Sequence, residues 1–353
     1  MKRFSIIGAG GGGLAIAHRL IENNCEVLVY DKDQEKISKL KDTDLMIYSK
    51  TKNTVHKFNS TNNLKDIFEF SNFIFISITT NNILSLTKEI VNYLNDDMIL
   101  FLNPGHTFGA LEMFNILKEK RKNLCPVIAE AQDLLFVSRI NKDLTELNIK
   151  NVKRHMSFAA LNPNDNKKIS EGIGSMFDEF QAESSVLMTS LGNMSPILHT
   201  IPMLFNLVKI DNKSSFKFYH EGITPSLAKI MKKMDDERLK IGRACGINLI
   251  SIEEWLKKSY NLVGDDLYEL IQSNNSYSSI EGPLTLDHRF ITEDVSSGLV
   301  PMATFAKKLN VETPVMDSII SLFSELLDYD FIQEGRNINK IDANILEEII
   351  KNI

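Results

Sequence analysis

The chain has 353 residues and a formal net charge of −6 at pH 7, and 43% of its residues are hydrophobic. This length suits two domains, and the acidic balance argues against nucleic acid or an anionic membrane as a partner. No apolar run approaches the roughly 18 residues that span a bilayer. Cys25, Cys125 and Cys245 are widely spaced, which predicts neither a disulfide framework nor a zinc site. We therefore expect a cytoplasmic protein without a bound metal.

The N-terminal segment follows a strand, glycine turn, helix and strand pattern. The apolar run 4–7 stops at the glycine-rich segment 8–13, and apolar residues then repeat at helical spacing over 14–21. A second apolar run, 27–30, ends on Asp31. This pattern predicts the opening β-α-β unit of a dinucleotide-binding sheet.

Each glycine of this motif, and the acidic residue that follows it, has a physical role in binding a dinucleotide. Gly8 permits the tight turn, Gly10 lets the backbone approach a pyrophosphate, and Gly13 lets the helix pack against the strand. The helix N-terminus offers unpaired N–H groups to the phosphates. Asp31 is placed to accept the hydroxyls of an adenosine ribose and would repel a 2′-phosphate. NAD is therefore favoured over NADP, although the neighbouring Lys32 leaves NADP open.

A secretory signal peptide is the alternative explanation of the same segment. Lys2 and Arg3 precede an apolar stretch with small residues at Ala15 and Ala17. The glycines would interrupt the apolar region of a signal peptide, and we set this alternative aside.

Strands alternate with helices through the rest of the first half. The pattern predicts helices over 34–40, 83–94, 111–117 and 167–180, and strands over 73–78, 98–102, 127–129, 134–140 and 152–161. The polar stretch 42–63 is either a small ribbon or a long loop. The alternation predicts a Rossmann-type doubly wound parallel sheet over 1–188, with ligands at the carboxyl ends of its strands. Thr79 and Asn103 follow two such strands, so we expect both in the cofactor site.

Helix signals dominate the second half, which we expect to form an all-helical domain over 189–353. Thr224 and Pro225 are an N-cap and a first-turn proline, and apolar residues at helical spacing follow as far as Cys245. Residues 251–254 form a capping box, and Thr313 with Pro314 opens a further helix.

A nicotinamide enzyme needs a group that exchanges a proton near neutral pH and a cation for a substrate carboxylate. Among the histidines, His199 is favoured because it lies where the architecture changes. Arg289 could hold a carboxylate, and Asp294 could orient an imidazole. The structural alternative is an ion pair of Arg289 with Glu293 or Asp294.

The sequence resembles the NAD/NADP octopine/nopaline (opine) dehydrogenase family over almost its full length. The matching segments include the Gly8 turn, Leu-Asn-Pro-Gly at 102–105, Glu-Gly-Ile-Thr-Pro-Ser at 221–226, and Glu-Asp-Val-Ser-Ser-Gly-Leu-Val-Pro at 293–301. The resemblance implies an NAD(P)-binding domain, a helical domain and a cleft between them. It also implies reductive condensation of an amino acid with a 2-oxo acid, often pyruvate.

The resemblance carries over to particular residues. It implies that His199 and Asp294 perform the acid/base step and that Arg289 binds a substrate carboxylate, with Asn193 lining the same site. Ser195 and Thr200 depart from the family pattern, so the substrates are less constrained than the reaction type. A homodimer is left open.

Other functions are compatible with the same fold. A simple 2-oxo or 3-hydroxy acid dehydrogenase would need no amine, and a metallophore-forming synthase would use a larger one. A non-catalytic NAD(H) sensor would bind cofactor without turnover.

Overall fold

The computed structural model describes residues 1–351, and these fold into two compact units. The first unit comprises Met1–Gly105 and Gly109–Val186, and the second comprises His106–Phe108 and the described chain from Leu187 onward. The sequence prediction included 106–108 in the first domain. This segment packs with the second unit because the Phe108 ring lies 5.1 Å from the Phe305 ring and the Phe108 N–H donates to Ser190 Oγ.

An eight-stranded sheet organises the first unit, in the order β12-β11-β8-β7-β6-β1-β2-β5. Its strands are β1 (Arg3–Ile7), β2 (Glu26–Tyr30), β5 (Ser60–Thr61), β6 (Phe73–Ile76), β7 (Ile99–Leu102), β8 (Val127–Ala131), β11 (Met156–Ala160) and β12 (Phe180–Ala182). The strands from β5 to β8 are parallel, whereas β11 pairs antiparallel with β8. The sequence order changes direction at β1, which lies between β2 and β6, and such a switch point is where doubly wound sheets bind ligands. The predicted fold class is confirmed.

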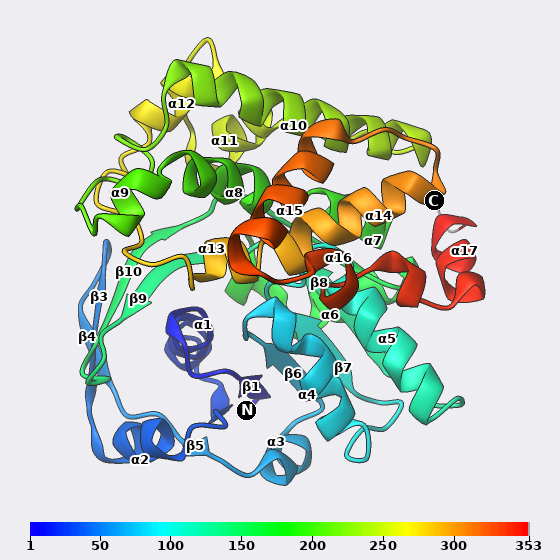
Figure 1. Cartoon of the computed structure of the whole chain (residues 1–353). Helices are drawn as coiled ribbons and strands as arrows, with labels where there is room; N and C mark the ends of the chain where they lie inside the picture. The colour runs from blue at the N-terminus through cyan, green and yellow to red at the C-terminus, as the bar shows by residue number, and fades with distance from the viewer. Residues whose placement is uncertain (352–353) are drawn as a thin grey trace. The chain divides into compact units, whose positions relative to one another are not determined.

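A second, four-stranded sheet has the order β4-β3-β10-β9. It contains β3 (Leu45–Ser49), β4 (Thr54–His56), β9 (Phe136–Ile140) and β10 (Glu146–Val152). The polar stretch that the sequence left undecided is therefore largely a ribbon, and its strand β3 extends the sheet by pairing in parallel with β10. Helix α1 (Gly11–Glu22) contacts β1 and β2 as well as β9 and β10, as Figure 1 shows. This helix thus packs against both sheets.

The remaining helices of the first unit are amphipathic, with an apolar side turned to the core. They are α2 (Gln34–Asp42), α3 (Leu64–Phe70), α4 (Ile83–Ile90), α5 (Gly109–Lys120) and α6 (Asn166–Ile173), and α4 lies beside α5 (Figure 1). The helix predicted over 167–180 is wrong in its second half. α6 ends at Ile173, because the φ of +53° at Gly174 cannot continue a right-handed helix. A short 3-10 turn over Gly174–Phe177 follows, and Phe180 begins β12.

The second unit is helical, as the sequence predicts. Its helices include α7 (Val186–Leu191), α8 (Ser195–Phe205), α9 (Leu207–Asp211), α10 (Pro225–Ala244), α11 (Ile252–Tyr260), α12 (Leu267–Ser273), α13 (Arg289–Thr292), α14 (Val300–Lys308), α15 (Pro314–Leu327), α16 (Phe331–Glu334) and α17 (Ala343–Lys351). The Thr224 hydroxyl caps α10 by accepting from the Leu227 N–H, and the capping box of Ser251 and Glu254 opens α11.

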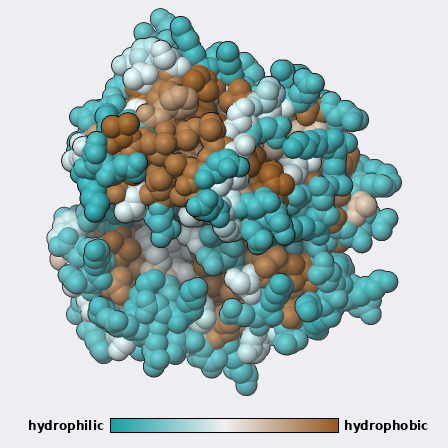
Figure 2. Space-filling model, viewed as in Figure 1, coloured by the Kyte–Doolittle hydropathy of each residue, from teal (hydrophilic) through white to brown (hydrophobic). Residues whose placement is uncertain are grey.

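Much of the face in Figure 2 is hydrophilic, and the largest group of hydrophobic residues lies over the second unit, with smaller groups elsewhere on the face. Exposed apolar side chains of this unit include Phe205, Val208, Leu322 and Leu326. Within residues 1–351, none of the helices has both the length and the apolar character needed to cross a bilayer.

Candidate active site

The turn after β1 is built from glycines that no other residue could replace without movement. Gly8 has a φ of +113°, and a Cβ there would lie 2.2 Å from the carbonyl oxygen of Ser77, which follows β6. A Cβ on Gly13 would lie 1.9 Å from the carbonyl oxygen of Gly8. These contacts press the start of α1 onto the turn and bring the loops after β1 and β6 together at the switch point.

Gly10 differs from Gly8 and Gly13 because the space beside its Cα, where a side chain would lie, is empty. A Cβ built on Gly10 would meet no atom within 4 Å, and Gly10 caps α1 without a side-chain hydrogen bond. The first amides of α1 are therefore available to an anion, and the helix dipole favours one there. This open space fits the pyrophosphate of a dinucleotide.

Two further residues predicted for the cofactor site lie in loops after neighbouring strands. Thr79 precedes the short turn Thr80–Asn82 after β6, and its hydroxyl accepts a hydrogen bond of 2.6 Å from Asn82. Asn103 follows β7 and is 1% exposed, and no residue in the described part of the chain hydrogen-bonds its Oδ1. A buried acceptor of this kind fits a ligand donor such as a ribose hydroxyl or an amide N–H.

Asp31 lies at the end of β2, and its carboxylate faces the glycine turn. It accepts hydrogen bonds from the N–H of Ala9 at 3.0 Å and of Asp33 at 3.1 Å, and it pairs with Lys36 Nζ at 2.9 Å. The carboxylate thus fixes the turn and α2 while one cation, Lys36, lies beside it. The cation that pairs with Asp31 is Lys36 rather than Lys32, its neighbour in the sequence.

The second unit brings together the predicted acid/base pair. His199, in the middle of α8, is 8% exposed, and its Nδ1 lies 2.7 Å from Oδ2 of Asp294, which is 3% exposed. Because a carboxylate only accepts, Nδ1 carries a proton, and Nε2 is the nitrogen that exchanges one. Nε2 hydrogen-bonds the hydroxyl of Tyr219 at 2.8 Å.

The packing of α13 and the turn that follows it on α8 explains how His199 and Asp294, 95 positions apart, come into contact. Asp294 joins α13 to the π-helical turn Val295–Leu299. A Cβ on Gly298 would lie 2.3 Å from Pro196 Cγ, so this turn packs directly on the start of α8. The Phe290 ring stacks on the His199 ring at 3.9 Å and fixes its plane.

Arg289 begins α13 and remains partly exposed, with 39% of its side chain accessible. Its Nη1 lies 3.5 Å from Glu293 Oε2, and Glu293 Oε1 lies 4.0 Å from His106 Nδ1. The ion pair considered as the structural alternative is therefore present with Glu293, while Asp294 pairs with His199 instead. An exposed guanidinium held by one carboxylate keeps donors available for a substrate anion.

Asn193 is completely buried just before α8. Its Oδ1 accepts from the Ser195 N–H at 3.1 Å, and its Nδ2 lies 3.3 Å from Thr107 Oγ1. These bonds fix the start of the helix that carries His199. A direct substrate contact by Asn193 stays a prediction.

Two family models and a curated relative match this chain. Residues 182–327 match the family described as NAD/NADP octopine/nopaline dehydrogenase, alpha-helical domain, and residues 4–123 match the ketopantoate reductase PanE/ApbA family. The chain is 34% identical to an opine dehydrogenase of Arthrobacter sp. (strain 1C), over 96% of this chain and 95% of the relative. The chain belongs to the opine dehydrogenase family. It is an NAD(P)-dependent oxidoreductase.

Solved structures of opine dehydrogenases share the fold. An octopine dehydrogenase in complex with NADH and agmatine matches with a TM-score of 0.82 at 16% identity, covering 100% of this chain and 98% of the other. A yersinopine dehydrogenase with bound NADP⁺ matches with a TM-score of 0.78 at 13% identity, covering 99% and 98%.

Two residues of this opine dehydrogenase site were not assigned a functional role from the sequence. Tyr219 hydrogen-bonds His199, and Glu293, which is 2% exposed, pairs with Arg289. Tyr219 lies two residues before the family-specific segment 221–226, which was the available signal. Glu293 was considered only as a surface ion-pair partner, because burial cannot be deduced from an isolated acidic residue.

Proposed function

We propose that this opine dehydrogenase condenses an L-amino acid with a 2-oxo acid, with pyruvate as the 2-oxo acid, and reduces the product with NADH. The observation that carries the proposal is the buried pair of His199 and Asp294, joined at 2.7 Å. An imidazole held by a carboxylate can give and take a proton near neutral pH. The product is an N-(carboxyalkyl)amino acid.

His199 acts as the general acid in this scheme. Its protonated Nε2 donates to the carbonyl oxygen of the 2-oxo acid as the amine nitrogen attacks the carbonyl carbon. His199 Nε2 then takes a proton from the new ammonium nitrogen and returns it to the carbinolamine hydroxyl, which leaves as water, and the imine remains in its protonated form. Bound NADH supplies the hydride that reduces the imine carbon. The sum consumes one amino acid, one 2-oxo acid, one NADH and one proton, and it releases one opine, NAD⁺ and water.

Asp294 and Tyr219 position the imidazole rather than react. The Asp294 carboxylate keeps the proton on Nδ1 and stabilises the imidazolium form. The Tyr219 hydroxyl hydrogen-bonds Nε2 at 2.8 Å and so fixes the orientation of the ring. The substrate oxygen would replace this hydroxyl at Nε2 when it binds. The stacked Phe290 excludes water from the other side of the ring.

Arg289 binds the carboxylate of the 2-oxo acid in this proposal. Its planar guanidinium can make two parallel hydrogen bonds to a carboxylate, and Glu293 holds it on one side. This contact selects a 2-oxo acid over a neutral ketone.

NAD is the proposed cofactor because of Asp31. A carboxylate at the end of β2 accepts ribose hydroxyls and repels a 2′-phosphate. The partial neutralisation of Asp31 by Lys36, at 2.9 Å, weakens that repulsion without removing it. NADPH should therefore bind more weakly than NADH.

The decisive experiment is NADH oxidation by the purified protein with pyruvate and a panel of L-amino acids. The matched control omits the amine. Oxidation that requires both partners supports the proposal and identifies the amine. Oxidation with pyruvate alone would instead make the protein a simple 2-oxo acid reductase. Silence across the panel with NADH binding intact would contradict the condensation of pyruvate with an L-amino acid and leave an unusual substrate or the sensor function.

The substitution His199→Ala tests the assignment of the acid. Turnover should fall by at least about a thousandfold, because the remaining Asp294 carboxylate has no proton to donate. The affinity for NADH should stay unchanged. The control is His155→Ala, in the other unit, which should leave the rate unaltered. A His199→Ala enzyme of near-normal rate would refute the assignment.

A further inference from the structure

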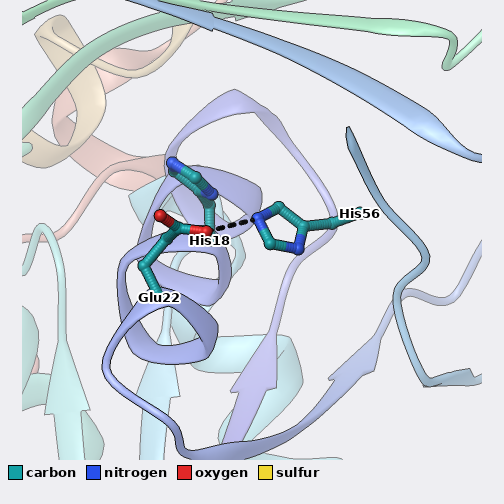
Figure 3. Close-up of side chains that lie close together, drawn as sticks. All are labelled: His18, Glu22 and His56. Carbon is teal, nitrogen blue, oxygen red and sulfur yellow. Dashed lines mark hydrogen bonds and ion pairs between the residues drawn. The ribbon is translucent and has the colours of Figure 1, made fainter. Parts of the chain in front are cut away.

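Three potential metal-ligating side chains of the first unit converge, and none of them is assigned to the cofactor or the substrates. His18 and Glu22 lie four residues apart on α1, so they project from the same side of the helix, and His56 ends β4. One ligand atom from each of the three lies within 4.8 Å of the others. Figure 3 shows the two imidazole rings and the carboxylate drawn together between the helix and the strand.

We propose that His18, Glu22 and His56 bind a divalent transition-metal ion of the zinc class. Two imidazoles and one carboxylate are a favoured donor set for Zn²⁺, which accepts nitrogen and oxygen ligands at about 2.0–2.2 Å. Three protein ligands leave a fourth coordination position for water. A hard ion such as Mg²⁺ is disfavoured, because it prefers oxygen ligands.

The hydrogen-bonding state of the cluster suits a metal ion. Nδ1 of His18 is buried, and no group in residues 1–351 hydrogen-bonds it. His56 Nε2 lies 3.0 Å from Glu22 Oε1, while the other oxygen, Oε2, lies 3.4 Å from Lys52 Nζ. A metal ion would replace the contact between Glu22 and His56 and leave the contact with Lys52 in place.

The protonation states favour binding as well. Burial, together with the neighbouring His56, lowers the pKa of His18 to about 4, so its ring is neutral at pH 7. Burial opposes ionisation of Glu22, but Lys52, together with His18 and His56, holds the pKa of Glu22 below its usual value. The cluster therefore offers a neutral imidazole and an ionised carboxylate, which are the ligating forms.

The distances require only a small closure. Two ligands on one tetrahedral ion lie roughly 3.4 Å apart, given bonds of about 2.1 Å. Glu22 is exposed and its long side chain can move without disturbing the core. The rings of His18 and His56 already lie with centroids 5.0 Å apart. Side-chain rotations that move the ligand atoms by about an ångström would complete the site.

The ion would fasten the edge strand β4 to α1. This helix begins at the glycine turn, whereas β4 pairs only with β3 at the edge of the second sheet. A ligand that binds the folded chain alone stabilises it by mass action. The proposed role is therefore structural, and it is independent of the opine reaction.

The test is Zn²⁺ titration of the full-length, EDTA-treated protein by calorimetry, with Co²⁺ absorption as a second readout. We expect one ion per chain, a visible Co²⁺ band of low coordination number, and a rise in melting temperature of at least about 3 °C at saturating Zn²⁺. His56→Gln and Glu22→Gln should each weaken binding by at least about tenfold. Glu22 is exposed and His56 ends the edge strand β4, so the variants should remain folded.

The matched control is His155→Gln, which removes a histidine of the same unit outside the cluster. It should bind Zn²⁺ like the unaltered chain. Absence of stoichiometric binding, or equal affinity in His56→Gln and the unaltered chain, would overturn the proposal. Neither result would affect the proposed opine reaction, because the readouts are binding and stability rather than turnover.

Discussion

The carboxylate of Asp294 determines which nitrogen of His199 can exchange a proton. Asp294→Asn replaces an obligatory acceptor by an amide that can also donate, so the imidazole can adopt the wrong tautomer. We expect the fold to persist and the rate of NADH oxidation to fall by about a thousandfold or more. Steady-state kinetics with the identified amine and pyruvate measure this change.

The control for that substitution lies in the same segment of the chain. Asp287 is exposed and seven residues upstream, and Asp287→Asn removes the same charge without touching His199. Its rate should match that of the unaltered enzyme. Equal losses in the two variants would mean that net charge, and not the tautomer of His199, sets the rate.

Arg289 offers a second test at the scale of single residues. Arg289→Lys keeps the positive charge but loses the planar pair of donors, so the KM for pyruvate should rise about tenfold or more. The KM for NADH should stay constant. Arg243→Lys, at the exposed end of α10, is the matched control. An unchanged KM for pyruvate would exclude Arg289 as the carboxylate ligand.

At the scale of elements, the turn between β1 and α1 contains one glycine that packing requires and another that cofactor binding requires. A Cβ at position 13 would collide with the Gly8 backbone, whereas one at position 10 would meet nothing. Gly13→Ala should therefore destabilise the protein by about 2–4 kcal/mol. Gly10→Ala should melt normally yet bind NADH about tenfold more weakly, because its methyl group occupies the open space.

Thermal unfolding and NADH fluorescence titration distinguish these two effects. Each glycine variant serves as the control for the other, since both add one methyl group to the same turn. Normal NADH affinity in Gly10→Ala would show that the cofactor does not approach this backbone.

The segment from α13 to α14 shows where local patterns are insufficient. Residues 286–301 contain charged residues, serines, a glycine and a proline, which are typical of a loop. The structure instead forms α13, a π-helical turn and α14, because Gly298 packs against Pro196 and the buried Arg336 N–H donates to the Ser296 carbonyl. These contacts join residues far apart in the chain, so no local pattern could reveal them.

At the scale of the whole molecule, His18 links stability to pH. Its pKa is near 6.5 in the unfolded chain and about 4 in the folded one, because of burial and repulsion by His56, with smaller lowering contributions from Arg19 and Lys52 that Glu22 partly opposes. The unfolded state therefore binds more protons between these values, and stability falls as the pH drops from 6.5 towards 4. After discounting for partial exposure of the ring, the loss is about 1–2 kcal/mol.

Denaturant unfolding at pH 7 and pH 4.5 in EDTA measures that loss. His18→Gln should lose less stability over this interval than the unaltered chain, whatever its stability at pH 7. Parallel losses in the two proteins would show that His18 is not the group responsible.

The sequence by itself determined those features of this protein that depend on residues close together in the chain. The glycine turn, Asp31, the alternation of strands and helices, and the caps of α10 and α11 depend on neighbouring residues, so periodicity and spacing predicted them. The family-specific segments then indicated His199, Asp294 and Arg289.

Only the tertiary structure decided which side chains meet. The hydrogen bond of Tyr219 to His199, the burial of Asn193, and the convergence of His56 on His18 and Glu22 each join separate elements. Such contacts depend on the packing of elements distant in sequence. A single chain read in order carries no signal for them, because the same residues could equally lie at an exposed surface.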